Sequence, residues 1–133
     1  MNTVVISAGS NIEPFANLDR AVDLLKEHLR VLACAKRLTT GPVGFLDQPD
    51  FVNTAFLAET DLDAASLKSF LRGVEDRLGR VRGPNKYGPR TIDLDIAVFN
   101  GEIMDNDVVE WDFLRELVLE VAPELKGRLF RRS

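Results

Sequence analysis

The chain has 133 residues, of which 45% are hydrophobic and 29% are charged, and its formal net charge at pH 7 is −4. This length suffices for one domain with a sizeable core, which we expect to span residues 1–133, and the composition excludes global disorder. The negative charge argues against a general nucleic-acid binder or a protein that adheres to anionic membranes.

The beginning of the chain is typical of a β-strand and a helix rather than of a targeting segment. It lacks the basic start and long apolar run of a signal peptide, and no segment reaches the roughly 18 apolar residues that span a bilayer, so we expect a cytoplasmic location. A strand is predicted over 4–8, before Gly9-Ser10-Asn11. Apolar residues at three- and four-residue spacing then predict a helix over 14–29, capped by Asn11 or Asn17.

The single cysteine and the single histidine carry no metal chemistry. Cys34 lies in a strand predicted over 31–38, where we expect a small core residue. His28 lies late in the first predicted helix, where a surface role is expected. Zinc sites of the cysteine and histidine type need more ligands than these two residues supply.

A loop over 39–50 contains glycine and proline but also several large apolar side chains, so it must cover something. It leads into a strand predicted over 51–58, along which Phe51 and Asn53 lie on the same face. An amide beside an aromatic ring can read the edge of a flat heterocycle. The alternative, in which Asn53 bonds the loop backbone, is equally compatible with the sequence.

The remaining helices complete the predicted architecture. A second amphipathic helix, capped by Asp61 or Asp63, extends to about Leu78, and a short third helix over 114–121 is stopped by Pro123. Helices and strands are mixed rather than strictly alternating. The pattern therefore predicts an α+β sandwich in which helices cover a largely antiparallel sheet.

The densest chemistry of the chain lies at 79–101, where a cationic loop runs directly into a strand predicted over 91–99 and an Asn-Gly hairpin turn. Because side chains alternate along a strand, Asp93 and Asp95 project to the same side. Two carboxylates at this spacing repel each other unless a cation lies between them, and they suit Mg²⁺.

The loop before this strand supplies the complementary charge. Its cations would repel one another in an empty loop but would converge on a polyphosphate; they are Arg80, Arg82, Lys86 and Arg90. Cations opposite a metal-binding carboxylate pair are typical of phosphoryl transfer. The alternative is a set of solvated acids beside a solvated basic loop.

Several motifs run through nearly the whole chain in order: Gly9-Ser10-Asn11, Asp47-Gln48-Pro49-Asp50, Gly79-Arg80-Val81-Arg82, the run 87–96, and Ala122-Pro123-Glu124-Leu125. Together they resemble the hydroxymethyl-dihydropterin pyrophosphokinases of folate biosynthesis. The Gly-Pro-Arg-Thr-Ile-Asp-Leu-Asp run is highly specific.

The resemblance implies a ferredoxin-like α+β fold and a reaction in which pyrophosphate passes from ATP to the hydroxymethyl group of 6-hydroxymethyl-7,8-dihydropterin, with release of AMP. Asp93 and Asp95 would hold two Mg²⁺ ions and act in catalysis with Arg80 and Arg90. Residues expected to bind the nucleotide are Glu75, Arg80, Arg82, Arg90 and Arg115. Residues expected to bind the pterin are Thr40, Pro42, Val43, Phe51, Asn53 and Tyr87. The implied partners are these small molecules, without nucleic acid or membrane, and we expect a monomer.

The chain departs from the family pattern in its last third. Glu110 stands where the family usually has a histidine that contacts ATP, and the segment 111–121 is several residues shorter than expected. Arg115 aligns with a nucleotide-binding arginine, and Leu117 with a pterin-covering phenylalanine, when gaps are placed on both sides. Two functions therefore stay open: a working pyrophosphokinase, or a non-catalytic module that binds pterin or nucleotide.

Overall fold

A computed structural model describes residues 1–41, 47–80 and 90–127. The elements are β1 (Asn2–Ser10), α1 (Pro14–Leu25), β2 (Arg30–Cys34), β3 (Leu38–Thr40), β4 (Phe51–Thr60), α2 (Ala64–Arg77), β5 (Asp93–Phe99), β6 (Glu102–Ile103), α3 (Asp107–Glu110), α4 (Asp112–Val121) and the 3₁₀ turn η1 (Pro123–Leu125). In the described residues the strands form one sheet in the order β2-β4-β1-β5-β6, with β3 also paired to β4. Every strand pair is antiparallel, which confirms the predicted α+β fold.

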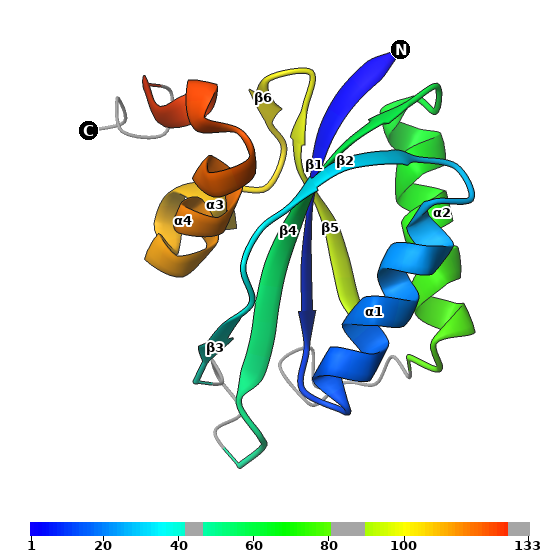
Figure 1. Cartoon of the computed structure of the whole chain (residues 1–133), viewed down its shortest axis with the longest axis vertical. Helices are drawn as coiled ribbons and strands as arrows, with labels where there is room; N and C mark the ends of the chain where they lie inside the picture. Colours follow the sequence, from blue (N-terminus) through cyan, green and yellow to red (C-terminus); the bar gives the residue numbers. More distant parts are fainter. Residues whose placement is uncertain (42–46, 81–89, 128–133) are drawn as a thin grey trace.

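Helices cover the two faces of the sheet unequally (Figure 1). Helices α1 and α2 lie against one face, and the shorter α3 and α4 lie against part of the other. Alternation along β1 feeds both cores, because Val4 and Ile6 pack toward α1 and α2 whereas Val5 packs toward α4. The sheet face that α3 and α4 leave uncovered is the place where a site can form.

Strand β5 carries the predicted carboxylates on the face of α4. Its register with β1 shifts between Val5 and Ile6, so Ala97 is an extra residue of a bulge. Before that bulge Leu94 packs into the core of α1 and α2, and Asp93 and Asp95 point to the opposite face, as predicted. The Asn100-Gly101 turn after β5 leads back into β6 as a hairpin, as predicted.

Two of the predicted elements differ from the structure by more than two residues, and the short helix α3 was not predicted. The first helix ends at Leu25 rather than 29, and residues 26–28 form a turn. The strand predicted over 31–38 is divided into β2 and β3, which pair with different parts of β4. Between the two strands the Ala35 N–H still donates to the Ala55 carbonyl of β4, but the next groups bond side chains: the Thr54 hydroxyl donates to the Ala35 carbonyl, and the Lys36 N–H donates to Glu120.

The predicted caps were half right. Asp63 caps α2, where its carboxylate accepts a hydrogen bond from the Ser66 N–H at 2.7 Å. Helix α1 begins after Glu13, which is left-handed and makes no side-chain cap, so neither Asn11 nor Asn17 caps this helix. The Asn17 amide instead donates to the Ile12 carbonyl at 2.6 Å. The side chain of Asn11 therefore has a role other than helix capping.

The single cysteine and histidine both lie at the surface. Cys34 is exposed, contrary to the predicted core position, because alternate residues of the edge strand β2 remain in solvent. His28 is exposed, as predicted, and its ring meets that of Phe70 edge-on at 4.8 Å between centroids. Within the described ranges, none of the helices has the length and apolar character needed to cross a bilayer.

Candidate active site

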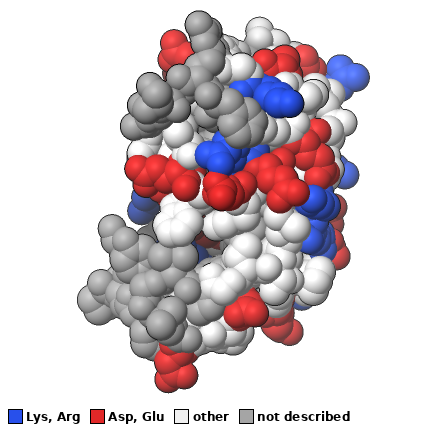
Figure 2. All heavy atoms as spheres, turned by 90° about the vertical axis from the view of Figure 1, so that its left-hand side faces the viewer, with Lys and Arg blue, Asp and Glu red and all other residues white. Residues whose placement is uncertain are grey.

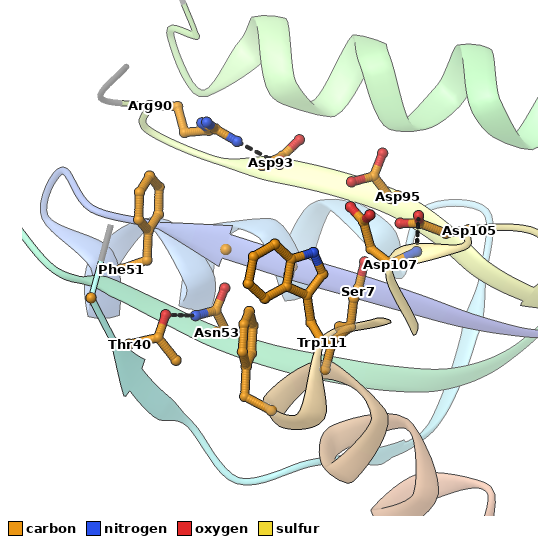
Figure 3. A pocket seen from close by; sticks show the side chains of 15 residues that line it. Ser7, Thr40, Phe51, Asn53, Arg90, Asp93, Asp95, Asp105, Asp107 and Trp111 are labelled. Atoms are coloured by element: carbon orange, nitrogen blue, oxygen red, sulfur yellow. Dashed lines mark hydrogen bonds and ion pairs between the residues drawn. The ribbon is translucent and has the colours of Figure 1, made fainter. Parts of the chain in front are cut away.

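A cavity of about 180 Å³ lies where α3 and α4 leave the sheet uncovered (Figure 3). Five separate stretches of chain contribute to its walls. The lining residues are Ser7, Ala8, Gly9, Thr40, Gly41, Phe51, Asn53, Arg90, Asp93, Asp95, Asp105, Asp107, Trp111, Phe113 and Leu114. One end of the cavity is rich in charge and the other in aromatic and amide groups, so we describe them as the charged end and the aromatic end.

The charged end holds Asp93 and Asp95 from β5, with Asp105 and Asp107 close by. Acidic side chains also form a band on the outer surface of this side of the molecule (Figure 2). The Asp95 carboxylate retains solvent-exposed surface, yet enough protein surrounds it that desolvation, followed by repulsion from Asp93, Asp105 and Glu75, raises its pKa to about 7. Burial likewise raises the pKa of Asp105. This end is therefore a place where a cation relieves repulsion.

The donor set suits a cation that takes most of its ligands from elsewhere. Among residues 1–41, 47–80 and 90–127, no three Asp, Glu, His or Cys side chains come together in a way that could enclose a metal ion. Asp93 and Asp95 nevertheless share one strand face and one cavity. A pair of carboxylates that leaves the remaining positions to phosphate and water is the arrangement in which Mg²⁺ is commonly bound.

Two arginines meet on one of these carboxylates. Arg80 lies 3.0 Å from Asp93 Oδ1, and Arg90 lies 2.9 Å from Asp93 Oδ2. Both guanidinium groups are mostly buried, with side-chain exposures of 19% and 17%. The Arg90 guanidinium also lies over the ring of Phe51, 5.1 Å from its centroid, and so joins the charged end to the aromatic end.

The end of α2 aims Arg80 at the site. Gly79 has a φ of 82°, and the N–H groups of Gly79 and Arg80 donate to the carbonyls of Asp76 and Glu75. This is a Schellman ending, in which glycine takes the left-handed position without strain. Arg80 therefore leaves the helix in a defined direction, toward β5.

Glu75 has a different position from the predicted nucleotide contact. Its side chain is 5% exposed, pairs with Arg80 at 2.6 Å, and accepts the Leu94 N–H at 2.8 Å. Within the described residues β6 pairs with β5 at Val98 and Phe99, so the outer edge of β5 near Leu94 needs another acceptor. Glu75 supplies it and holds β5 and Arg80 together, while its carboxylate does not line the cavity.

The aromatic end is built around Asn53. Its amide donates to the Thr40 hydroxyl at 2.7 Å, and both residues line the cavity beside Phe51. Gly9 pairs with Asn53 across the strands, and a Cβ at position 9 would lie 2.8 Å from Asn53 Oδ1. The glycine therefore gives the amide its room, which the sequence motif alone did not reveal.

The start of α4 and the residue before it contribute aromatic side chains that were not predicted from the sequence. Trp111 and Phe113 line the cavity, with their ring centroids 6.2 Å apart. Their presence at the start of a mostly aliphatic segment was an available signal. The predicted cover residue Leu117 is instead fully buried in the core beneath α4, because it lies one helical turn beyond Phe113 on the sheet-facing side.

Arg115, which was predicted to bind the nucleotide, and Glu110, which departs from the family pattern, lie outside the cavity wall, as does Arg80. Arg115 donates to the Val109 carbonyl at 2.6 Å and pairs with Asp112, so in the described structure it ties α3 to α4 rather than lining the cavity. Glu110 accepts a hydrogen bond from the Asn106 amide at 2.8 Å. Pro42, Val43, Arg82 and Tyr87 fall outside the described residues, so their assigned roles stay predictions.

The family model and the sequence relatives place the chain in one family. Residues 5–123 match the profile of the 7,8-dihydro-6-hydroxymethylpterin-pyrophosphokinase (HPPK) family. The chain is 35% identical over 127 residues to the 2-amino-4-hydroxy-6-hydroxymethyldihydropteridine pyrophosphokinase of Bacillus subtilis, and covers 75% of that protein. It is 34% identical to the protein of the same name from Haemophilus influenzae over 110 residues, covering 80% of this chain and 68% of the relative.

A solved structure supports the fold. The chain superimposes on Plasmodium falciparum HPPK-DHPS with a TM-score of 0.58 and 14% identity, over 90% of this chain and 33% of the longer one. It therefore spans about a third of that solved chain. At this identity the likeness bears on the fold alone.

Proposed function

Since this chain belongs to the 7,8-dihydro-6-hydroxymethylpterin-pyrophosphokinase family, we propose that it transfers pyrophosphate from ATP to the hydroxymethyl group of 6-hydroxymethyl-7,8-dihydropterin and releases AMP, a step of folate synthesis. The observation that carries this proposal is the pairing of unlike ends in one cavity. An acidic pair with two arginines lies beside a wall of aromatic and amide groups. The acidic pair and the arginines suit a metal-bound triphosphate, and the aromatic and amide groups suit a flat heterocycle.

The charged end fits magnesium and phosphate. Asp93 and Asp95 would hold Mg²⁺, and a pair of ions is part of the proposal. Bound there, the metal would neutralise phosphate charge and polarise the phosphoryl oxygens. The raised pKa of Asp95 supports the assignment, because a carboxylate crowded by other acids is stabilised by a cation.

Arg80 and Arg90 would bind the phosphates. Each already binds a carboxylate oxygen of Asp93, and phosphate oxygens are acceptors of the same kind. Because both guanidinium groups are mostly buried, they are held in place before any ligand arrives, which favours the transition state electrostatically. Arg82 keeps its predicted role in nucleotide binding, while Glu75 is assigned to positioning Arg80.

The aromatic end would bind the pterin. Phe51 offers a ring face, and the Asn53 amide with the Thr40 hydroxyl offers polar groups for the edge of the heterocycle. Phe113 takes over the covering role that was predicted for Leu117, since it lines the same cavity. Pterin stacked beside Arg90 would bring its hydroxymethyl group toward the charged end.

The test is to incubate the protein with ATP, Mg²⁺ and 6-hydroxymethyl-7,8-dihydropterin and to assay AMP. We expect AMP formation that requires all three components. Binding of both ligands without AMP would instead identify a binding module, the alternative that Glu110 and the short segment 111–121 leave open. A cytoplasmic location and a monomeric state remain predictions.

A further inference from the structure

Asn11 connects three segments of the chain although it does not line the cavity. The residue is 4% exposed and lies directly after β1. Its side-chain oxygen accepts the Arg90 N–H at 2.9 Å, and its backbone N–H donates to the Arg90 carbonyl at 3.2 Å. Its amide nitrogen donates to Gln48 Oε1 at 2.7 Å and to the Pro49 carbonyl at 3.1 Å.

The orientation of this amide is fixed by its partners. The Arg90 N–H can only donate and the Pro49 carbonyl can only accept, so the oxygen of Asn11 must face the former and its nitrogen the latter. Both groups belong to the main chain and cannot turn around. Asparagine is therefore matched to this position, because an isosteric aspartate keeps the acceptor and loses the donor.

The segments that Asn11 joins lead into the two strands of the site. Pro49 stands two residues before Phe51, where β4 begins and the aromatic end starts. Arg90 precedes β5 and carries the guanidinium that contacts both Asp93 and the Phe51 ring. Asn11 thus holds the entries of β4 and β5 against each other through the backbone, on a path separate from the contact between Arg90 and Phe51.

We propose that Asn11 is a positioning residue that sets the aromatic end of the cavity relative to the charged end. Helix capping does not account for it, because α1 begins after Glu13 without a side-chain cap. The inference rests on the proposed function for its catalytic consequence, while the physical link between the two strand entries can be measured without turnover. Without the hydrogen bonds of Asn11, the aromatic end should shift relative to the charged end. Each end should still bind its ligand, but the heterocycle and the phosphates should no longer be aligned.

Two variants at position 11 separate the two halves of the link. Asn11→Ala removes both contacts, whereas Asn11→Asp keeps an acceptor for the Arg90 N–H and leaves the Pro49 carbonyl without its donor. The Pro49 carbonyl can only accept, so the new carboxylate offers it no hydrogen bond. The matched control is Asn2→Asp, which makes the same change at the far end of β1, where the Asn2 amide donates to the Leu62 carbonyl at 2.8 Å.

The first measurement is hydrogen exchange of the Arg90 amide in the ligand-free protein. We expect protection in the wild type and in Asn11→Asp, and a loss of roughly tenfold in Asn11→Ala, since that variant leaves the N–H without its acceptor. Equal protection in the wild type and Asn11→Ala would overturn the proposal, whether or not the protein proves to be active.

The second measurement is steady-state kinetics of AMP formation, and wild-type activity here tests the proposed function separately. We expect Asn11→Asp to raise the KM for pterin roughly tenfold with little change in the KM for ATP, and Asn11→Ala also to lower kcat. Asn2→Asp should match the wild type in both constants. Wild-type constants in both Asn11 variants, or equal effects of Asn11→Asp and Asn2→Asp, would reduce Asn11 to a general contributor to stability and contradict the proposal.

Discussion

The two ends of the cavity are built in different ways. At the charged end, Glu75, Arg80, Asp93 and Arg90 form a continuous chain of ion pairs, all from α2 and β5 or the residues beside them. At the aromatic end, the walls come from β3, β4 and the start of α4, and they are joined by the hydrogen bond from Asn53 to Thr40 rather than by a chain of ion pairs. A substitution at the charged end should therefore also affect the residues paired with it, whereas the effect of a substitution at the aromatic end should stay local.

The largest effect is expected from removing a carboxylate at the charged end. Asp95→Asn should lower turnover by about three orders of magnitude or more, because charge stabilisation by a metal is worth several kcal/mol. Folding should be nearly intact, since the substitution removes repulsion rather than a partner. The check is AMP formation together with thermal unfolding. Asp19→Asn, which breaks an exposed pair with Arg37, is the control, and wild-type turnover in Asp95→Asn would refute the metal assignment.

Arg80→Ala tests whether the charged end behaves as a network. Turnover should fall by roughly 10²- to 10³-fold, more than nucleotide binding weakens, if this charge meets the transition state. The free energy of unfolding should also drop by about 2 kcal/mol or more, because Glu75 is left buried without one of its partners. Arg77→Ala, which breaks an exposed pair with Glu27, should change the free energy of unfolding far less than Arg80→Ala does and should leave turnover unchanged. Equal behaviour of the two variants would mean that Arg80 is a surface charge.

The sequence located the carboxylate pair of the charged end but not the aromatic residues near α4, and the reason is physical. Asp93 and Asp95 lie two apart on one strand, so local alternation fixes their common face before any tertiary contact is known. Trp111 and Phe113 reach the cavity through the packing of α4 against the sheet, and no local rule states which turn of that helix faces the opening. The gapped alignment consequently selected Leu117, one turn too far along.

The same contrast explains the two roles that the sequence did not predict. Glu75 and Asn11 are polar residues that bond backbone groups of Leu94, Pro49 or Arg90 from distant segments. The sequence predicted a nucleotide contact for Glu75 and a helix cap for Asn11. Which backbone groups lack a strand partner is a property of the assembled sheet, so it becomes visible in the structure.

Phe113→Ala and Leu117→Ala compare the aromatic end with the core beneath it. Phe113→Ala should weaken pterin binding by roughly 1–3 kcal/mol, as loss of an aromatic stacking face does, with a small effect on stability. Leu117→Ala should lower the free energy of unfolding by about 2–5 kcal/mol, because it empties a fully buried position, and should weaken binding less. Calorimetry with a pterin analogue and urea unfolding measure the two quantities. The reverse pattern would return the covering role to Leu117.

A smaller effect should appear as a pH dependence of the charged end. The pKa of Asp95 is raised to about 7, so between about pH 4 and 7 the native protein binds more protons than the unfolded chain. Without metal, this group therefore lowers stability as pH rises through that window. Mg²⁺ competes with the proton, and its affinity should fall by up to roughly tenfold per pH unit below 7. Urea unfolding and Mg²⁺ titration at pH 5, 6, 7 and 8 test this. Asp95→Asn should lose the part of each pH dependence that Asp95 contributes, and identical pH profiles of the wild type and this variant would contradict the prediction.

If the two ends of the cavity act on two substrates in one reaction, phosphorus NMR of the wild-type protein should follow that reaction. With ATP, Mg²⁺ and 6-hydroxymethyl-7,8-dihydropterin, we expect the ATP signals to give way to equal amounts of AMP and a pterin diphosphate, and omission of the pterin should stop the change. Unchanged ATP signals in the presence of bound pterin, or formation of ADP in place of AMP, would show that the two ends do not act in this reaction.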